Sequence, residues 1–161
     1  MLGTMNKFFL FFLSFVLIIS CSKTNAIVEK KNPTFQKMTF DVVTKELIFE
    51  GLFPDRVTLL SEQWFNSKIK VNGLEGNMVF TLKNYSEEIS VIQDGKRIDI
   101  SLEFIVILTK SSLSQRKIIK GQVSSFSTLK GSFSLAEFDQ LIENTQNDLI
   151  VRLSSDLKSK I

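Results

Sequence analysis

Apolar and polar residues alternate along much of the second half of the chain, and this period of two predicts β-strands. In the clearest case residues 98, 100, 102 and 104 are apolar, while the residues between them are charged or hydroxylated. Such alternation is typical of a strand with one buried face. Residues 105–108 are apolar throughout, so we expect this end of the strand to be covered on both sides. Similar patterns predict strands over residues 69–71, 78–83 and 117–129, and over 35–49 with a break near Thr44-Lys45.

One dipeptide predicts how two of these strands are joined. Asp94-Gly95 is flanked on both sides by apolar residues that favour strands. Both of its residues suit a type I′ turn, which needs a positive φ at each central position. The sequence therefore predicts a β-hairpin at Asp94-Gly95.

Two other segments show the period of an α-helix. After Pro54-Asp55, apolar residues recur at intervals of three and four up to Trp64, which assigns Trp64 to the core. Near the C-terminus, Ser134 and Glu137 form a capping-box pattern, and Phe133 and Phe138 form a hydrophobic staple. An apolar helical face follows as far as Leu157 and predicts a long C-terminal helix.

The order of these elements predicts the fold class. A strand is followed by a helix, several antiparallel strands and a long helix. We expect an α+β fold with an antiparallel or mixed sheet of about four strands and both helices packed on one face.

The N-terminal segment decides the expected location of the protein. Lys7 precedes the almost wholly apolar residues 8–19, which have the length of a secretory signal. Residues 17–21, Leu-Ile-Ile-Ser-Cys, resemble the bacterial lipobox, which implies a diacylglycerol thioether on Cys21, cleavage before it and acylation of the new N-terminus. An ordinary membrane anchor with a coincidental cysteine is the alternative, and the sequence leaves the start codon open between Met1 and Met5.

These features define the expected domains. Residues 1–20 form a lipoprotein signal peptide, 21–34 a lipidated tether, and 35–161 a single α+β domain. Cleavage before Cys21 leaves 19 Lys and Arg (20 less Lys7) against 17 Asp and Glu, a net charge of only +2. Because nucleic-acid-binding surfaces are strongly basic, we expect no nucleic-acid partner.

Composition also limits the chemistry. The chain has no histidine, which is the commonest general base and metal ligand. Cys21 is its only cysteine, so no disulfide forms within the chain. We therefore expect no enzymatic activity, no cofactor and no metal site; a lipid-anchored hydrolase would lack a base.

The C-terminal half carries a family resemblance. A long strand, a glycine-containing strand, a Ser-rich stretch with an aromatic residue, and another aromatic just before the last helix occur in this order, with Gly121, Phe126, Ser132 and Phe133 at the matching positions. This order resembles the LPS-assembly lipoproteins (LptE type) of Gram-negative bacteria over roughly residues 97–160. The resemblance implies an outer-membrane lipoprotein that partners a β-barrel translocon and assists the transport of lipopolysaccharide. Ser22, which replaces the aspartate that retains lipoproteins in the inner membrane, also favours the outer membrane, with the domain on its periplasmic face.

Five basic residues are candidates for pairing with the phosphates of lipid A: Arg116, Lys117, Lys120, Lys68 and Lys70. The alternative interpretation is that they are solubilising charges on edge strands. For the protein as a whole, the alternative is an auxiliary lipoprotein subunit of an ABC-type lipid transport system, and a purely structural envelope protein also remains open.

Overall fold

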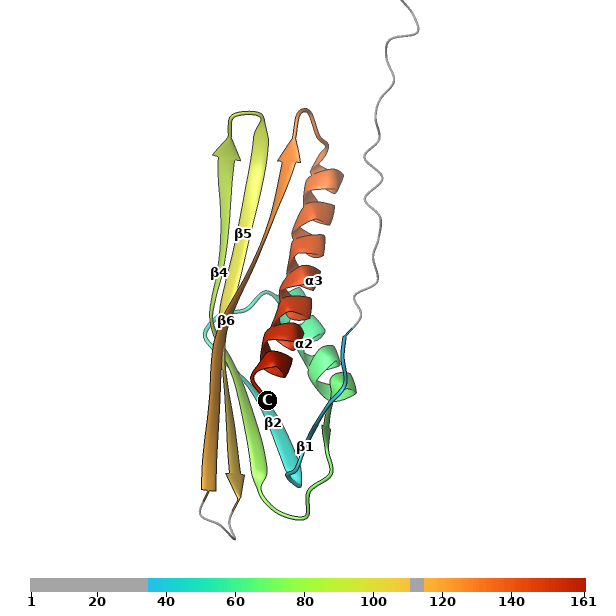
Figure 1. Cartoon of the computed structure of the whole chain (residues 1–161). Coiled ribbons are helices and arrows are strands. Elements are labelled where there is room, and N and C mark those ends of the chain that lie inside the picture. Colours follow the sequence, from blue (N-terminus) through green and yellow to red (C-terminus); the bar gives the residue numbers. More distant parts are fainter. Residues whose placement is uncertain (1–34, 111–114) are drawn as a thin grey trace, which may run out of the picture. The chain divides into compact units, whose positions relative to one another are not determined.

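The computed structural model describes residues 35–110 and 115–161. The predicted signal peptide and tether, including Cys21 and Ser22, lie outside the described residues. The elements in chain order (Figure 1) are β1 (Met38–Phe40), β2 (Thr44–Glu50), α2 (Asp55–Lys68), β3 (Ile69–Val71), β4 (Asn77–Ile92), β5 (Gly95–Lys110), β6 (Gln115–Lys130) and α3 (Leu135–Ser159).

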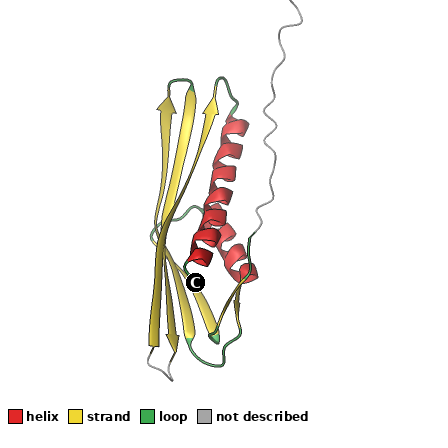
Figure 2. Cartoon of the chain, viewed as in Figure 1, coloured by secondary structure: helices red, strands yellow, loops and turns green. Residues whose placement is uncertain are grey.

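Four strands form the main sheet, in the order β2-β4-β5-β6. β4, β5 and β6 make an antiparallel meander, whereas β2 pairs in parallel with β4. Both helices lie on one side of this sheet (Figure 2), so the predicted α+β fold with a mixed four-stranded sheet is confirmed. The first predicted strand breaks at residues 41–43, slightly earlier than expected, and β1 pairs in parallel with β3 in a separate two-stranded sheet.

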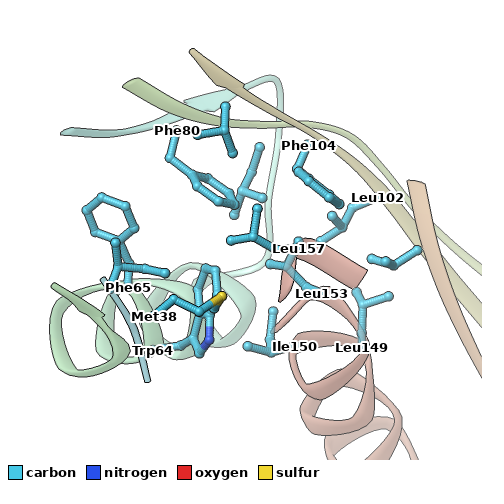
Figure 3. Close-up of a cluster of buried hydrophobic side chains, with 14 of the residues drawn as sticks. Met38, Trp64, Phe65, Phe80, Leu102, Phe104, Leu149, Ile150, Leu153 and Leu157 are labelled. Atoms are coloured by element: carbon cyan, nitrogen blue, oxygen red, sulfur yellow. The ribbon is translucent and has the colours of Figure 1, made fainter. Parts of the chain in front are cut away.

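The face of the main sheet toward the helices, which we call the inner face, carries the core. In β5 the side chains of Ile98, Ile100, Leu102 and Phe104 are at most 1% exposed, as the alternation predicts. Side chains from the strands, α2 and α3 meet in one cluster (Figure 3). Trp64 is 1% exposed with its ring centroid 5.5 Å from that of Phe80, which confirms it as a core residue.

The two helices begin in different ways. At α3 the predicted capping box is confirmed: Ser134 Oγ accepts from the Glu137 backbone N–H at 3.2 Å, and the Glu137 carboxylate accepts from the Ser134 N–H at 2.7 Å. The rings of Phe133 and Phe138 stack with centroids 6.0 Å apart. At α2, Pro54 occupies the N-cap without a side-chain hydrogen bond, because proline has no side-chain acceptor. No helix within residues 35–110 and 115–161 has the length and apolar character needed to cross a membrane.

The β4–β5 hairpin forms, but not with the predicted turn. Gln93 and Asp94 are the two loop residues, and Gly95 already pairs with Ile92 as the first residue of β5. Of Gln93, Asp94 and Gly95, only Gly95 has a positive φ, +156°, so the type I′ prediction for Asp94-Gly95 is wrong. The glycine is needed for a close approach: a Cβ there would lie 1.8 Å from the backbone oxygen of Leu129 on β6.

Candidate functional site

The face of the sheet directed away from the helices, which we call the outer face, carries an aliphatic patch. Directly paired residues share a face, so Val79, Ile107 and Ile118 form one row across β4, β5 and β6. The next row holds Thr81 and Ile105, with Ile48 of β2 beside Thr81. The aliphatic patch therefore consists of Ile48, Val79, Ile105, Ile107 and Ile118. Thr81, which lies among them, is only 8% exposed.

This patch corrects one expectation about β5. Residues 105–108 were expected to be covered on both sides because all four are apolar. Val106 faces the core and is fully buried, but Ile105 and Ile107 face outward and remain partly exposed. The helices pack only on the inner face, so no element of residues 35–110 and 115–161 covers this patch.

Two of the predicted basic residues border the patch. Residues two apart along a strand share a face, so Arg116 and Lys120 flank Ile118 on the outer face of β6. Arg116 pairs with Thr109 and Lys120 with Ile105. Both side chains are exposed, and neither makes an ion pair or hydrogen bond with another side chain of the described residues. Two uncompensated cations thus stand about 13 Å apart along the strand, at its rise of about 3.3 Å per residue.

The other three candidate basic residues do not border the patch. Lys117 pairs with Leu108 and belongs to the inner face, because it is one residue out of phase with Arg116. Lys68 is the last residue of α2. Lys70 lies in β3, in the other sheet, where its Nζ donates to the Asn66 carbonyl at 3.4 Å.

Carboxylates border the opposite side of the patch. Glu46 of β2 lies beside Val79, and Glu50 lies beside Lys83. Lys83 is already paired with Glu103 at 3.8 Å. The outer face is therefore polarised, with Arg116 and Lys120, which have no ion-pair partner among the described side chains, along β6 and acidic side chains along β2.

Near the hairpin the outer face changes character. Arg97 donates two hydrogen bonds to the Asp99 carboxylate, at 2.7 and 2.6 Å, and its guanidinium carbon lies 4.4 Å from the centroid of the Phe126 ring. These hydrogen bonds raise the pKa of Arg97 and lower that of Asp99. The Arg97 guanidinium is therefore already paired with the Asp99 carboxylate, whereas the side chain of Phe126 is 58% exposed.

The four positions that carry the family resemblance have different structural roles. Phe126 is exposed on the outer face, Phe133 belongs to the staple of α3, and Ser132 is exposed before that helix. Gly121 lies on the inner face, where an added Cβ would come within 2.4 Å of the Phe104 ring and the Asp156 carboxylate. Only Phe126 is therefore placed to meet a ligand on the outer face.

Sequence reasoning missed two polar groups on the inner side. Lys45 Nζ donates to the carbonyls of Phe65 and Ile69, at 3.0 and 2.6 Å, and so caps the C-terminus of α2. Its pKa is lowered, first by burial and then by the charge of Lys70. Only the parallel β2–β4 pairing brings it there, and no local pattern indicates that pairing.

The second missed group centres on a carboxylate of β4. Glu87 accepts from the Tyr85 hydroxyl at 2.6 Å and from the Gln146 amide at 3.3 Å. Burial, followed by this hydrogen bond, raises the pKa of Tyr85. In the described part of the chain, no group of three or more His, Cys, Asp or Glu side chains is arranged to hold a metal ion.

Comparison with known proteins adds likenesses of fold. No family model and no curated protein matches the chain. Among solved structures, rare lipoprotein B of Shewanella oneidensis is 16% identical, with a TM-score of 0.49 over 73% of this chain and 95% of that one. A minor lipoprotein of Acinetobacter baumannii is 8% identical, with a TM-score of 0.47 over 71% and 92%. The hypothetical protein CT253 of Chlamydia trachomatis is 7% identical, with a TM-score of 0.46 over 74% and 96%.

Proposed function

We propose that this protein is a non-catalytic lipoprotein of the outer membrane. Cys21 would anchor it at the periplasmic face, where it would assist lipopolysaccharide transport as the partner of a β-barrel translocon. The observation that carries this proposal is the outer face of β6, where Arg116 and Lys120 border an aliphatic patch. Within residues 35–110 and 115–161, no side chain pairs with these cations and no element covers the patch. That combination suits a lipid with anionic headgroups.

The chemistry of the face fits lipid A in two respects. Lipid A carries phosphates at both ends of a disaccharide, and the separation of Arg116 and Lys120 suits two spaced phosphates. Each phosphate would accept charge-assisted hydrogen bonds from one of these side chains. Acyl chains would cover the aliphatic patch, which gains about 25 cal/mol for each Å² of apolar surface removed from water.

The anchor rests on the lipobox-like segment alone, and its test is direct. Wild-type protein expressed in a Gram-negative host should lose its first 20 residues and incorporate labelled fatty acid. Cys21→Ala should accumulate as an unprocessed precursor without label. Ser20→Ala, which keeps a small residue before the cysteine, serves as the control and should be processed. A mature protein that begins anywhere other than Cys21 would contradict the anchor.

The lipid-binding face is tested with a matched pair of variants. Purified protein in detergent is passed over immobilised lipopolysaccharide at physiological salt. Arg116→Ser combined with Lys120→Ser should reduce capture severalfold, because both cations on the patch side are removed. Lys117→Ser removes a cation from the same strand but from the other face, and it should leave capture unchanged. Higher salt should weaken capture of the wild type, since exposed charges are screened.

Equal capture by the double variant and the wild type would exclude Arg116 and Lys120 from the site. Copurification from crosslinked membranes separates the two transport systems. A large β-barrel would support the proposal, whereas inner-membrane transport subunits would favour the auxiliary subunit of an ABC-type lipid transport system. If the wild type captures no lipopolysaccharide and copurifies with no large β-barrel, the assignment to this transport system fails.

A further inference from the structure

The edge of β4 is covered over only half of its length. β2 pairs with residues 77–83 of β4, while β5 pairs on the other side as far as Ile92. Between the two halves the register with β5 shifts, and Asn84 adopts a left-handed φ of +53°. Beyond this bulge, residues 86–92 pair with β5 on one edge, and no strand of the described residues pairs with their opposite edge. We call residues 86–92 the distal edge.

The distal edge lacks three of the features that often block a free strand edge, namely lysine, proline and a covering strand. It carries two carboxylates, Glu87 and Glu88, and it begins at the bulge. The distal edge, Ser-Glu-Glu-Ile-Ser-Val-Ile, has no basic residue and no proline. It also exposes apolar side chains, since Ile89 is 48% and Val91 83% exposed. Its unpaired backbone groups and these side chains together form a surface for strand addition.

We propose that the distal edge pairs, antiparallel, with the distal edge of a second copy of this chain, with Ile89 opposite Ile89 of that copy. In this register Glu87 lies opposite Val91 of the second copy, and Glu88 lies opposite Ser90. Because odd residues meet odd residues, the inner faces of both copies lie on the same side of one continuous sheet. The pairing thus brings the exposed aliphatic side chains of the two copies together.

Charge and space both favour this register. No like charges lie directly opposite each other, an arrangement that would destabilise the pair. Glu87 already accepts hydrogen bonds from Tyr85 and Gln146, so it needs no hydrogen-bond donor from the second copy. In this antiparallel arrangement, the β4–β5 turn of the second copy lies next to the end of β2, which pairs no further than Lys83. β2 therefore does not block the strand of the second copy.

The short length of the paired segment limits the affinity of the proposed dimer. Seven paired residues span about 24 Å at about 3.4 Å each. This is a short interface, so the dimer forms reversibly and depends on concentration. Attachment of both copies to one membrane, which rests on the proposed lipid anchor, would raise that concentration. Lipopolysaccharide binding is not required.

Cysteine crosslinking of the full chain in cells tests the register. Cys21 is the only native cysteine, so an introduced cysteine reports its own surroundings. Ile89→Cys should give a disulfide-linked dimer on mild oxidation. Ile118→Cys is the matched control, because Ile118 is also a strand isoleucine and is 47% exposed. The control and the unaltered chain should stay monomeric.

A second pair of variants keeps the test independent of Ile89. Coexpressed copies with Glu88→Cys and Ser90→Cys should crosslink at least severalfold more than either copy expressed alone, because the register places these positions opposite each other. Adding Ile89→Lys to both copies should remove most of that crosslink, since two lysines then face each other.

Three outcomes would overturn the proposal. Equal crosslinking at Ile118→Cys would indicate random collision. Absence of a dimer from both Ile89→Cys and the Glu88/Ser90 pair would leave the distal edge without a second copy. A disulfide to a different envelope protein would assign the edge to another partner. If purified protein in detergent crosslinks only at high concentration while Cys21→Ala abolishes the dimer in cells, the register stands and the anchor supplies the concentration.

Discussion

The inner and outer faces of the main sheet are built from the same strands, but neighbouring residues of a strand lie in opposite environments, one buried and one exposed to solvent. Along β5, Leu102 and Phe104 are fully buried, while Glu103 and Ile105 between and beside them remain partly exposed. The inner face holds the helices, whereas the outer face presents uncovered aliphatic and charged side chains. A change of one position along a strand therefore moves a substitution from the fold to the proposed binding surface.

The largest expected difference between the faces is at Phe104. Its ring is fully buried and stacks on Phe80 at a centroid distance of 5.9 Å. Phe104→Ala should lower the free energy of unfolding by about 3–5 kcal/mol, because it removes apolar contacts and leaves a cavity. Chemical denaturation measures this, with Glu103→Ala as the adjacent outward control at no more than about 1 kcal/mol. Similar losses for both variants would contradict the division into two faces.

A smaller effect is expected where the helix layer begins. Ser134→Ala removes the side-chain acceptor of the α3 capping box and should lower the free energy of unfolding by about 1 kcal/mol. Ser132→Ala is the control, because Ser132 is exposed and lies outside the helix. Circular dichroism during thermal unfolding compares the two. Equal midpoints would show that the capping box contributes little to stability.

The smallest effect on stability is expected on the outer face. Arg116→Ser with Lys120→Ser should change the free energy of unfolding by no more than about 0.5 kcal/mol, because both side chains are exposed and unpaired with other described side chains. The same denaturation experiment measures this change. A loss above about 2 kcal/mol would mean that these cations stabilise the fold. Reduced lipid capture by the double variant could then result from unfolding rather than from loss of a binding site.

The elements that could be predicted from the sequence are those with a local signature. α3 follows from the capping box at Ser134 and its helical period, and β5 follows from strict alternation. The parallel pairings of β2 with β4 and of β1 with β3 were not predicted. Their partners are separated by α2, and no short pattern records which strand lies beside which.

The candidate site was predicted in part for a similar reason. Arg116 and Lys120 do share a face, but Lys117 was grouped with them by closeness in sequence. The period of two already separates Lys117 from the others, and applying it would have placed that residue on the opposite face. The positions of Lys68 and Lys70 depend on where α2 and β3 pack, which the local sequence does not specify. The role of Cys21 stays a prediction, because it lies outside the described residues.

The parallel pairing of β2 with β4 also has a consequence for the order of folding. β4, β5 and β6 are neighbours in the chain, and their hairpins close short loops at small entropic cost. β2 and β4 are separated in the chain by α2 and β3. Their pairing therefore forms more slowly than the two hairpins, because it joins distant parts of the chain. We therefore expect an early state in which the whole edge of β4 is open. In that interval an unfolded chain is most exposed to aggregation, and docking of β2 is the step that ends it.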